Sequence, residues 1–184
     1  MIVKTDRLIL RPWTEADAES LYRYASDPRI GPMAGWEVHT SVDYSREIIR
    51  DVLSLPDNLA VEIQGINGGP VGAVGLIRKN ERNTYMQPNE VEVGYWIGVP
   101  FWGNGYIPEA VEALLSLSFE YLQVDAVWCG YYDGNEKSRR CQEKCGFRYH
   151  HSSPVFVDKL AEGRLEHYTR LTRAEWEERT GGEE

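Results

Sequence analysis

Residues 101–110 read FWGNGYIPEA, with two glycines one residue apart between an apolar run and an amphipathic stretch. A strand that leads through a glycine loop into a helix presents unpaired backbone N–H groups at the positive end of the helix dipole. Phosphate is the natural guest, because Gly103 and Gly105 let the backbone approach it without a Cβ. Further N–H donors come from Asn104, Tyr106 and Ile107. On spacing alone, a tight turn without a ligand is the simpler interpretation. No Gly-Lys-Ser/Thr follows, and the third glycine of the dinucleotide fingerprint is missing.

The pattern on both sides of this loop predicts one α+β domain, residues 1–184, with a mixed sheet. Alternation and turn signals predict strands at 2–11, 59–65, 70–78, 91–99, 126–132, 148–157 and 165–172. Helices are expected near 15–26, near 41–53, after the glycine loop and from Asn135 to Gly146, with a terminal helix and frayed tail over 173–184. About four helices should therefore flank the sheet, and the prolines and glycines of SDPRIGPMAG should interrupt regular structure.

Composition limits the classes of function. The chain has 20 basic and 29 acidic residues and a net charge of −9, which disfavours nucleic acid as a ligand and favours cationic small molecules or basic peptide termini. The start lacks the apolar core of a signal peptide, and no run approaches the roughly 20 apolar residues of a membrane span. Three cysteines without framework spacing indicate reduced thiols in a cytoplasmic protein.

Several segments taken together resemble one known family. EVGYWIGV, then FWGNGYIPEA, then NEKSRRCQEKCGF about thirty residues later, resemble the two signature segments of the GNAT superfamily of N-acetyltransferases. The opening TDRLILRPWTEADAESLY and the closing EHYTRLTRAEW look like the ends of the subgroup that contains the ribosomal-protein N-terminal (alanine/serine) acetyltransferases. The resemblance covers nearly the whole chain.

This resemblance implies a mostly antiparallel mixed sheet whose parallel central strands splay apart, with acetyl-CoA lying along the strand at 91–99. The pyrophosphate would sit on the loop, the pantetheine arm on strand backbone, and the amide of Asn135 on the same arm. The cofactor-binding residues carried over are Ile97, Val99, Trp102, Gly103, Asn104, Gly105, Tyr106, Ile107, Asn135 and Ser138. Two positions depart from the family pattern: Trp102 replaces a common Gln or Arg, and Ile107 replaces a small residue.

Glu92 is the candidate catalytic base. Acetyl transfer to an amine requires removal of a proton from the nucleophile, stabilisation of an oxyanion and a proton for the departing thiolate. Glu92 shares a strand face with Trp96, where the resemblance places a glutamate, and apolar neighbours would raise its pKa. The alternative is a strand glutamate paired with an arginine across the sheet. A backbone N–H near Trp96 or Ile97 would hold the oxyanion.

Ser138 is the second candidate catalytic residue. It lies one helical turn after Asn135 and would approach the cofactor sulfur, whereas Asn135 also has a plain role as a helix cap. Many superfamily members place a tyrosine acid seven residues after the asparagine, where this chain has Gln142. Ser138, a nearby tyrosine and water therefore remain open as the proton donor.

Acceptor recognition is expected from three segments: RIGPMAGWEVHTSVDYS, KNERNTYMQPNE and DKLAEGRLEHY. Candidate pocket residues are Trp36, His39 and Trp96. For Trp36 a core anchor, and for His39 a surface position, are the commoner roles. A metal site is not expected: buried thiols that pack a short helix explain the Cys and His residues more simply than zinc does. The residues in question are Cys141, Cys145, His150 and His151.

The sequence thus predicts an enzyme that passes an acetyl group from acetyl-CoA directly to a primary amine, either a protein N-terminus or a small molecule. No metal, nucleic acid or membrane is expected to take part, and a homodimer is compatible with the sequence. The alternatives are an acyltransferase with another acyl-CoA, a module that binds acetyl-CoA or a partner without turnover, and a Rossmann-type oxidoreductase, which the incomplete fingerprint disfavours.

Overall fold

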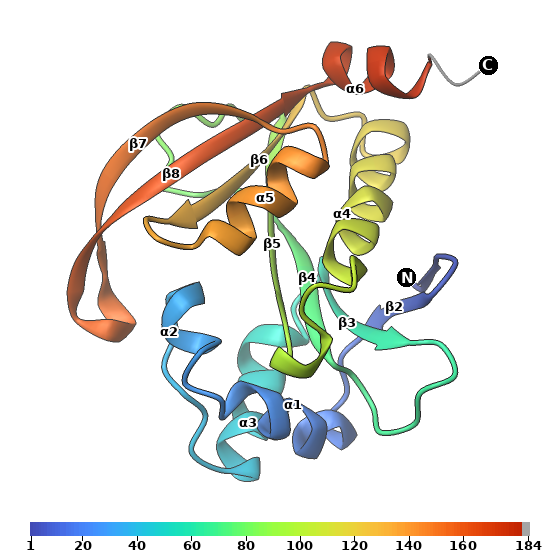
Figure 1. Ribbon diagram of the computed structural model, residues 1–184, viewed down its shortest axis with the longest axis vertical. Helices are drawn as coiled ribbons and strands as arrows, with labels where there is room; N and C mark the ends of the chain where they lie inside the picture. The colour runs from blue at the N-terminus through green and yellow to red at the C-terminus, as the bar shows by residue number, and fades with distance from the viewer. Residues whose placement is uncertain (182–184) are drawn as a thin grey trace.

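A computed structural model describes residues 1–181 of the chain, and its centre is an eight-stranded sheet in the order β1-β2-β3-β4-β5-β6-β8-β7 (Figure 1). The strands are β1 (Val3–Lys4), β2 (Leu8–Pro12), β3 (Asn58–Ile63), β4 (Gly72–Ile77), β5 (Glu90–Ile97), β6 (Ala126–Tyr132), β7 (Arg148–Val157) and β8 (Glu162–Thr172). Only β5 and β6 pair in parallel; the other neighbours are antiparallel. This sheet confirms the predicted fold class.

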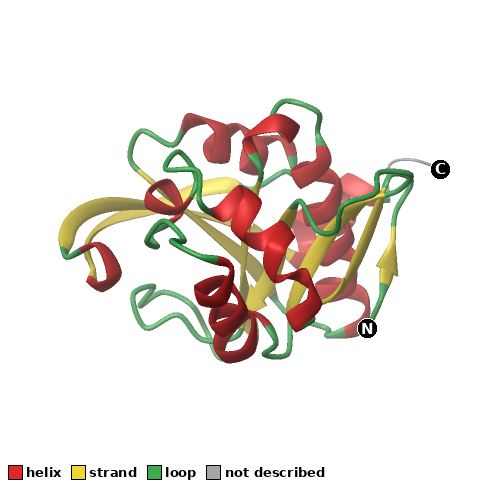
Figure 2. Cartoon of the chain, turned by 90° about the horizontal axis from the view of Figure 1, so that it is seen from below, coloured by secondary structure: helices red, strands yellow, loops and turns green. Residues whose placement is uncertain are grey.

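Helices cover both faces of the twisted sheet (Figure 2). They are α1 (Ala18–Ala25), α2 (Gly31–Ala34), α3 (Val42–Ile48), α4 (Tyr106–Ser116), α5 (Glu136–Lys144) and α6 (Arg173–Thr180). The short α2 lies in the segment expected to be irregular, where Pro32 occupies the first helical turn. The tail predicted beyond α6 lies partly outside the described residues.

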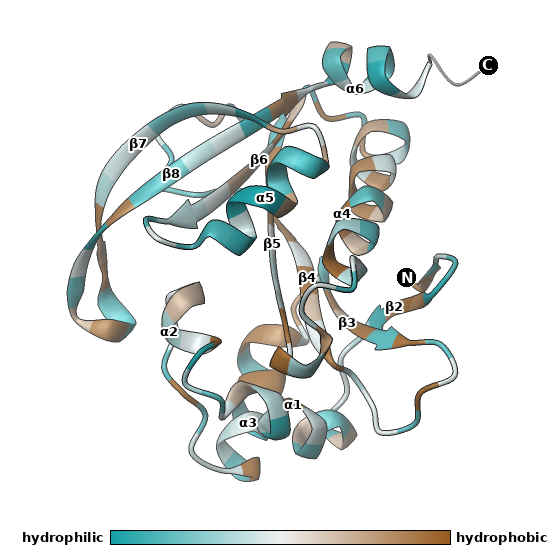
Figure 3. Cartoon of the chain, viewed as in Figure 1, coloured by the Kyte–Doolittle hydropathy of each residue, from teal (hydrophilic) through white to brown (hydrophobic). Residues whose placement is uncertain are grey.

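The core has two parts because side chains on the strands alternate between the faces. The larger cluster joins β2 to β6 to the inner side of α4, with Val91, Val93 and Ile97 of β5 among its members. The smaller cluster packs α1 and the end of α3 on the other face, and Trp96 of β5 lies against it. Hydropathy follows this division: α5 is mostly hydrophilic, whereas α4 alternates between hydrophilic and hydrophobic turns (Figure 3). The predicted alternation of β5 is present, because Val91, Val93 and Ile97 lie in one cluster and Trp96 packs against the other.

The N-terminal strand predicted over 2–11 is wrong in one respect, because it folds into two strands. β1 turns back on β2, with Val3 opposite Leu10. The turn is closed by a 3.0 Å bond from the Thr5 N–H to the Leu8 carbonyl and a 3.0 Å bond from the Leu8 N–H to the Thr5 hydroxyl. Threonine side chains compete in this way with regular backbone pairing, and simple alternation does not reveal it.

The sheet splits between β5 and β6. Their parallel pairing runs from Glu90 opposite Ala126 to Val93 opposite Cys129 and then stops. Beyond that point β5 stays with β4 as far as Ile97, and β6 stays with β8 as far as Tyr132. The two strands diverge visibly in Figure 1. After Val93, the N–H and C=O groups of β5 that point away from β4 therefore face the opening, because no strand pairs with them there.

An ion pair holds the closed end of this split. The Glu90 carboxylate, 3% exposed, accepts a 2.5 Å bond from the Arg170 guanidinium and a 2.6 Å bond from the Trp128 indole. We expect Arg170→Ala to lower the free energy of unfolding by about 2–4 kcal/mol, because it leaves a buried carboxylate without its cation. Urea denaturation measures this loss. Arg148→Ala is the control, since Arg148 pairs at the surface with Glu175 and should cost less than about 1 kcal/mol.

Candidate active site

The glycine loop has the backbone that its sequence requires. Gly103 and Gly105 both have φ of +77°, in the left-handed region that favours glycine, and Gly105 is the N-cap of α4. A Cβ on Gly103 would have no neighbour within 4 Å, so the outer side of the loop is open. The first N–H groups of an eleven-residue helix thus adjoin an accessible turn, which is the geometry that binds anions.

Arg7 is a residue of this loop that sequence analysis missed. Its guanidinium donates to the Asn104 carbonyl at 2.9 Å, pairs with Glu109 at 2.6 Å and lies 4.7 Å from the centre of the Tyr106 ring. A second cation, the Lys137 ammonium, lies 4.5 Å from the centre of the Trp102 ring. Positive charge therefore flanks the loop on two sides. No local pattern links Arg7 to a loop about a hundred residues later.

Trp102 fastens the loop to the end of β5. Its indole N–H donates to the Ile97 carbonyl at 3.0 Å, and its backbone N–H donates to the Val99 carbonyl at 3.2 Å. The pantetheine arm is expected on strand backbone near Ile97 and Val99, and the carbonyls of both residues already have an internal partner that a ligand would have to share. The Ile107 side chain is buried in the core against the sheet, so its backbone N–H is the part available to a ligand.

Glu92 lies on the face opposite α4, close to where β5 and β6 part. Its side chain is 5% exposed, and its Oε2 accepts a 2.7 Å hydrogen bond from the Asn80 amide. Burial raises the pKa of Glu92 to about 7; the Asn80 bond and the Arg82 charge lower it, and the Glu166 charge raises it. Within the described residues Glu92 forms no ion pair with an arginine, so the cross-sheet pairing alternative is absent.

Ser138 belongs to a partly buried hydrogen-bond chain on the α5 side of the split. Its hydroxyl lies 2.9 Å from the Tyr95 hydroxyl and 3.1 Å from the Gln142 amide nitrogen. The Gln142 amide oxygen in turn accepts from Thr169 at 2.8 Å. Burial raises the pKa of Tyr95 well above its usual value, so its hydroxyl keeps its proton. Tyr95 thus reaches the region where other family members place a tyrosine at the Gln142 position.

Asn135 caps α5. Its side-chain oxygen accepts a 3.2 Å bond from the Ser138 N–H, which confirms the capping role expected of it. The bond uses the amide oxygen and leaves the amide N–H groups for another partner. The cofactor contact that the resemblance implies for Asn135 stays a prediction.

The three candidate acceptor residues form one aromatic group. Trp36 meets Trp96 edge-on at 5.7 Å between ring centres and meets His39 at 5.3 Å. His39 is 6% exposed, and its Nδ1 lies 2.8 Å from the Ser45 hydroxyl. Burial lowers the pKa of His39 to about 4, so the ring is neutral at physiological pH. Trp36 and Trp96 are half-buried and pack against the smaller core cluster, which agrees with the core-anchor role for Trp36. His39 is buried, so the surface position that is commoner for a histidine is wrong here.

The cysteines and histidines do not assemble into a metal centre. Cys145 is buried in the core cluster, and His150 and His151 lie on β7 against Tyr85. Among residues 1–181, no group of three or more His, Cys, Asp or Glu side chains has the arrangement of a metal site.

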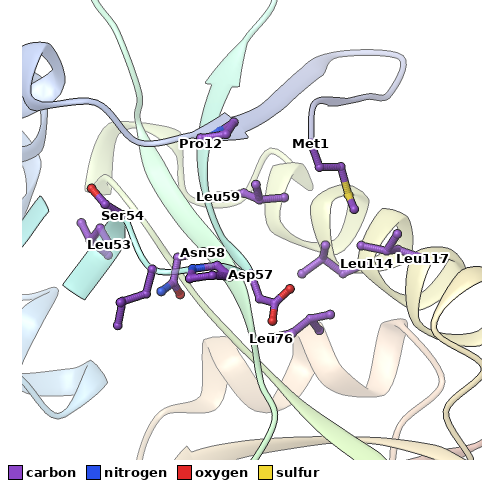
Figure 4. A pocket seen from close by; sticks show the side chains of 12 residues that line it. Met1, Pro12, Leu53, Ser54, Asp57, Asn58, Leu59, Leu76, Leu114 and Leu117 are labelled. Atoms are coloured by element: carbon purple, nitrogen blue, oxygen red, sulfur yellow. The ribbon is translucent and has the colours of Figure 1, made fainter. Parts of the chain in front are cut away.

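Figure 4 shows a hollow of about 310 Å³ whose lining includes neither Glu92 nor a residue of the glycine loop. It opens between the N-terminus, the turn before β3 and the end of α4, and leucines line much of it, including Leu59, Leu76 and Leu114. Its one carboxylate, Asp57, pairs with Arg78 at 2.6 Å. Because its one carboxylate among the described residues is already paired, this hollow offers no free acid or base, and we take the split of the sheet as the candidate active site.

The split sheet and the glycine loop are features that the resemblance to the GNAT superfamily predicts, and the buried glutamate lies close to where the sheet splits. Family comparison agrees: the profile of the acetyltransferase (GNAT) domain matches residues 7–148. The chain belongs to this family. Within the described residues, no helix is long and apolar enough to span a membrane.

Individual relatives support the same assignment. The chain is 28% identical to the "Uncharacterized N-acetyltransferase YoaA" of Bacillus subtilis, over 80% of this chain and 82% of YoaA. It is 31% identical to the "Putative ribosomal N-acetyltransferase YdaF" of the same organism, over 75% of this chain and 74% of that protein. Among solved structures, a GNAT-family acetyltransferase from Bacillus anthracis superposes with a TM-score of 0.80 at 20% identity, covering 95% of this chain and 99% of that one.

Proposed function

We propose that this protein transfers an acetyl group from acetyl-CoA directly to a primary amine, with Glu92 as the base. The observation that carries the proposal is the position of a buried carboxyl, with a pKa of about 7, beside the opening between β5 and β6. A base titrating near neutral pH is suited to remove a proton from an amine. The family match supports the acetyltransferase class, and the ribosomal acetyltransferase name of the relative YdaF favours a protein N-terminus as acceptor.

Acetyl-CoA supplies the thioester, and the chain supplies binding and proton transfer. The N–H groups around Gly103 and Gly105, with the charge of Arg7, would hold the pyrophosphate at the start of α4. Glu92 takes one proton from the acceptor ammonium, so that the nitrogen lone pair is free to attack the acetyl carbon. A backbone N–H of β5 beyond Val93 holds the oxyanion.

Release of the thiol needs one proton. Ser138 is the donor proposed, with the Tyr95 hydroxyl behind it at 2.9 Å to replace the proton. When the carbon–sulfur bond breaks, the thiolate takes the serine proton and Ser138 takes the tyrosine proton. The nitrogen of the new amide loses its second proton to solvent, the tyrosine recovers a proton from solvent, and Glu92 releases its proton to solvent before the next turnover.

Two measurements test this proposal. Calorimetric titration with acetyl-CoA and CoA should show binding at micromolar strength, whereas NADH should not bind. Thiol release should then be followed with a panel of amines that includes n-butylamine and short peptides beginning with alanine or serine. An absence of binding by either CoA species, or of acetylation of any amine in the panel, contradicts the proposal.

The activity should depend on pH through Glu92. Because the ionised form is the base, kcat/KM should rise with pH through about 7 and then level. The Asn80 bond stabilises that ionised form, so Asn80→Ala should raise the pKa of Glu92 and move the rise to higher pH. A pH profile from 5.5 to 9 measures this. The control is Asn89→Ala, an exposed asparagine bonded to Asp125, which should leave the profile in place.

A further inference from the structure

A second buried carboxyl lies beside Glu92. Glu166 of β8 is 5% exposed and sits opposite Tyr132 of β6. Its Oε2 accepts a 2.7 Å hydrogen bond from the Tyr168 hydroxyl. Burying a carboxylate costs free energy unless its oxygens are paired, so the surroundings of the other oxygen matter.

The two carboxyls converge over Gly130 of β6. A Cβ placed on Gly130 would lie 3.0 Å from the Oε1 of Glu166 and 3.4 Å from the Oε1 of Glu92. Any side chain at this position would fill the space between the two oxygens. Over the part of the chain that the structure describes, neither Oε1 accepts a hydrogen bond, although both side chains are nine-tenths buried. Two carboxylate oxygens that accept no hydrogen bond from the described residues thus both lie within 3.4 Å of the position that a Cβ on Gly130 would occupy.

Arg82 enters the same region from the loop between β4 and β5. Its guanidinium lies 3.5 Å from the Oε2 of Glu166 and donates to the Tyr132 hydroxyl at 3.0 Å. The Arg82 side chain is 44% exposed, so it approaches from the solvent side. It lies against the far oxygen of Glu166 and leaves the Oε1 free. The two carboxylates therefore attract a cation, and the Arg82 guanidinium supplies part of that positive charge.

We infer that Glu166 binds the ammonium group of the acceptor, with two of its N–H bonds shared between the Oε1 atoms of Glu166 and Glu92. The inference rests on the proposed function and adds the form in which the acceptor enters, a protonated primary amine. An ammonium carries three donors in a compact charge, which suits two converging acceptors. One carboxylate keeps the nitrogen in place while the other, Glu92, takes a proton from it.

The direct test is binding of n-butylammonium chloride to the full chain, followed by tryptophan fluorescence, since Trp96 lies on the same face of the sheet. Sodium chloride at equal ionic strength and n-butanol serve as controls for screening and for the alkyl chain. Glu166→Gln should weaken n-butylammonium binding tenfold or more and leave acetyl-CoA affinity within twofold. Glu143→Gln removes an equal charge from the exposed side of α5 and should change neither.

Steady-state kinetics with an amine that the enzyme acetylates separate binding from a structural role. Glu166→Gln should raise the KM for the amine at least tenfold with kcat within about threefold. Tyr168→Phe removes the bond to Glu166 but keeps its carboxylate, and should alter KM by less than threefold. Arg82→Ala removes the competing cation and should tighten n-butylammonium binding severalfold.

Three results overturn the inference: n-butylammonium does not bind the wild type, it binds Glu166→Gln as tightly as the wild type, or n-butanol binds equally well. Each can occur while acetyl-CoA still binds and amines are still acetylated, in which case the proposed function stands. Failure of acetyl-CoA binding in the wild type would instead contradict the proposed function.

Discussion

Glu92→Gln is expected to lower kcat by about 10²–10⁴-fold, the range associated with loss of a general base. Glutamine keeps the shape of the side chain and can still meet the Asn80 amide, but it cannot take a proton at neutral pH. The glycine loop leads into α4, on the opposite face of the sheet from Glu92, so the acetyl-CoA dissociation constant should stay within twofold. Single-turnover acetylation of an amine, with calorimetry for acetyl-CoA, measures both quantities.

The stability of the same variant provides a control for its folding. The pKa of Glu92 in the folded protein, about 7, lies above the ordinary value of 4.5. Between these pH values the folded protein binds more protons than the unfolded chain, so wild-type stability falls as pH rises through this window. A shift of this size corresponds to roughly 3 kcal/mol at most. Glu92→Gln should not show this loss, and its free energy of unfolding relative to wild type should increase from pH 4 to pH 8. Unchanged turnover in a folded Glu92→Gln would refute the assignment of the base.

Local chemistry was enough to predict most of the fold. The alternation of β5 between the two core clusters and the cap of Asn135 on α5 are both present. Each depends on residues within a few positions of one another, where sequence patterns are informative. The glycine loop belongs to the same group, because its positive φ angles follow from residue type.

The surroundings of the catalytic carboxyl could not be predicted in this way. Asn80 reaches Glu92 across a loop, and Glu166 reaches the same space from β8, 74 positions after Glu92 in the numbering. Strand order decides these contacts, since β8 inserts between β6 and β7 and so brings Glu166 beside Gly130. The sequence leaves a nearby tyrosine open as the proton donor but does not say which one, because the tyrosine expected by resemblance comes from α5, whereas here β5 supplies the hydroxyl next to Ser138.

Gly105→Val is expected to weaken acetyl-CoA binding by a hundredfold or more. Gly105 has φ of +77°, where a residue with a Cβ costs about 1–2 kcal/mol and a β-branched residue costs more. The valine methyl groups would also stand beside the first N–H groups of α4, where the phosphate would bind. If the loop relaxed to another φ at residue 105, those N–H groups would no longer point together at the phosphate. Calorimetry with acetyl-CoA measures the loss.

Gly65→Val separates the cost of backbone strain from the loss of a phosphate site. Gly65 has φ of +80° in the turn after β3, and a Cβ there would meet nothing within 4 Å. It should therefore lose about as much stability as Gly105→Val, by urea denaturation, and keep wild-type affinity for acetyl-CoA. Gly103→Ala, at φ of +77° with open space around it, should weaken binding by an intermediate factor. If folded Gly105→Val bound acetyl-CoA within threefold of the wild type, the loop would be a turn only, and the phosphates would have to bind elsewhere.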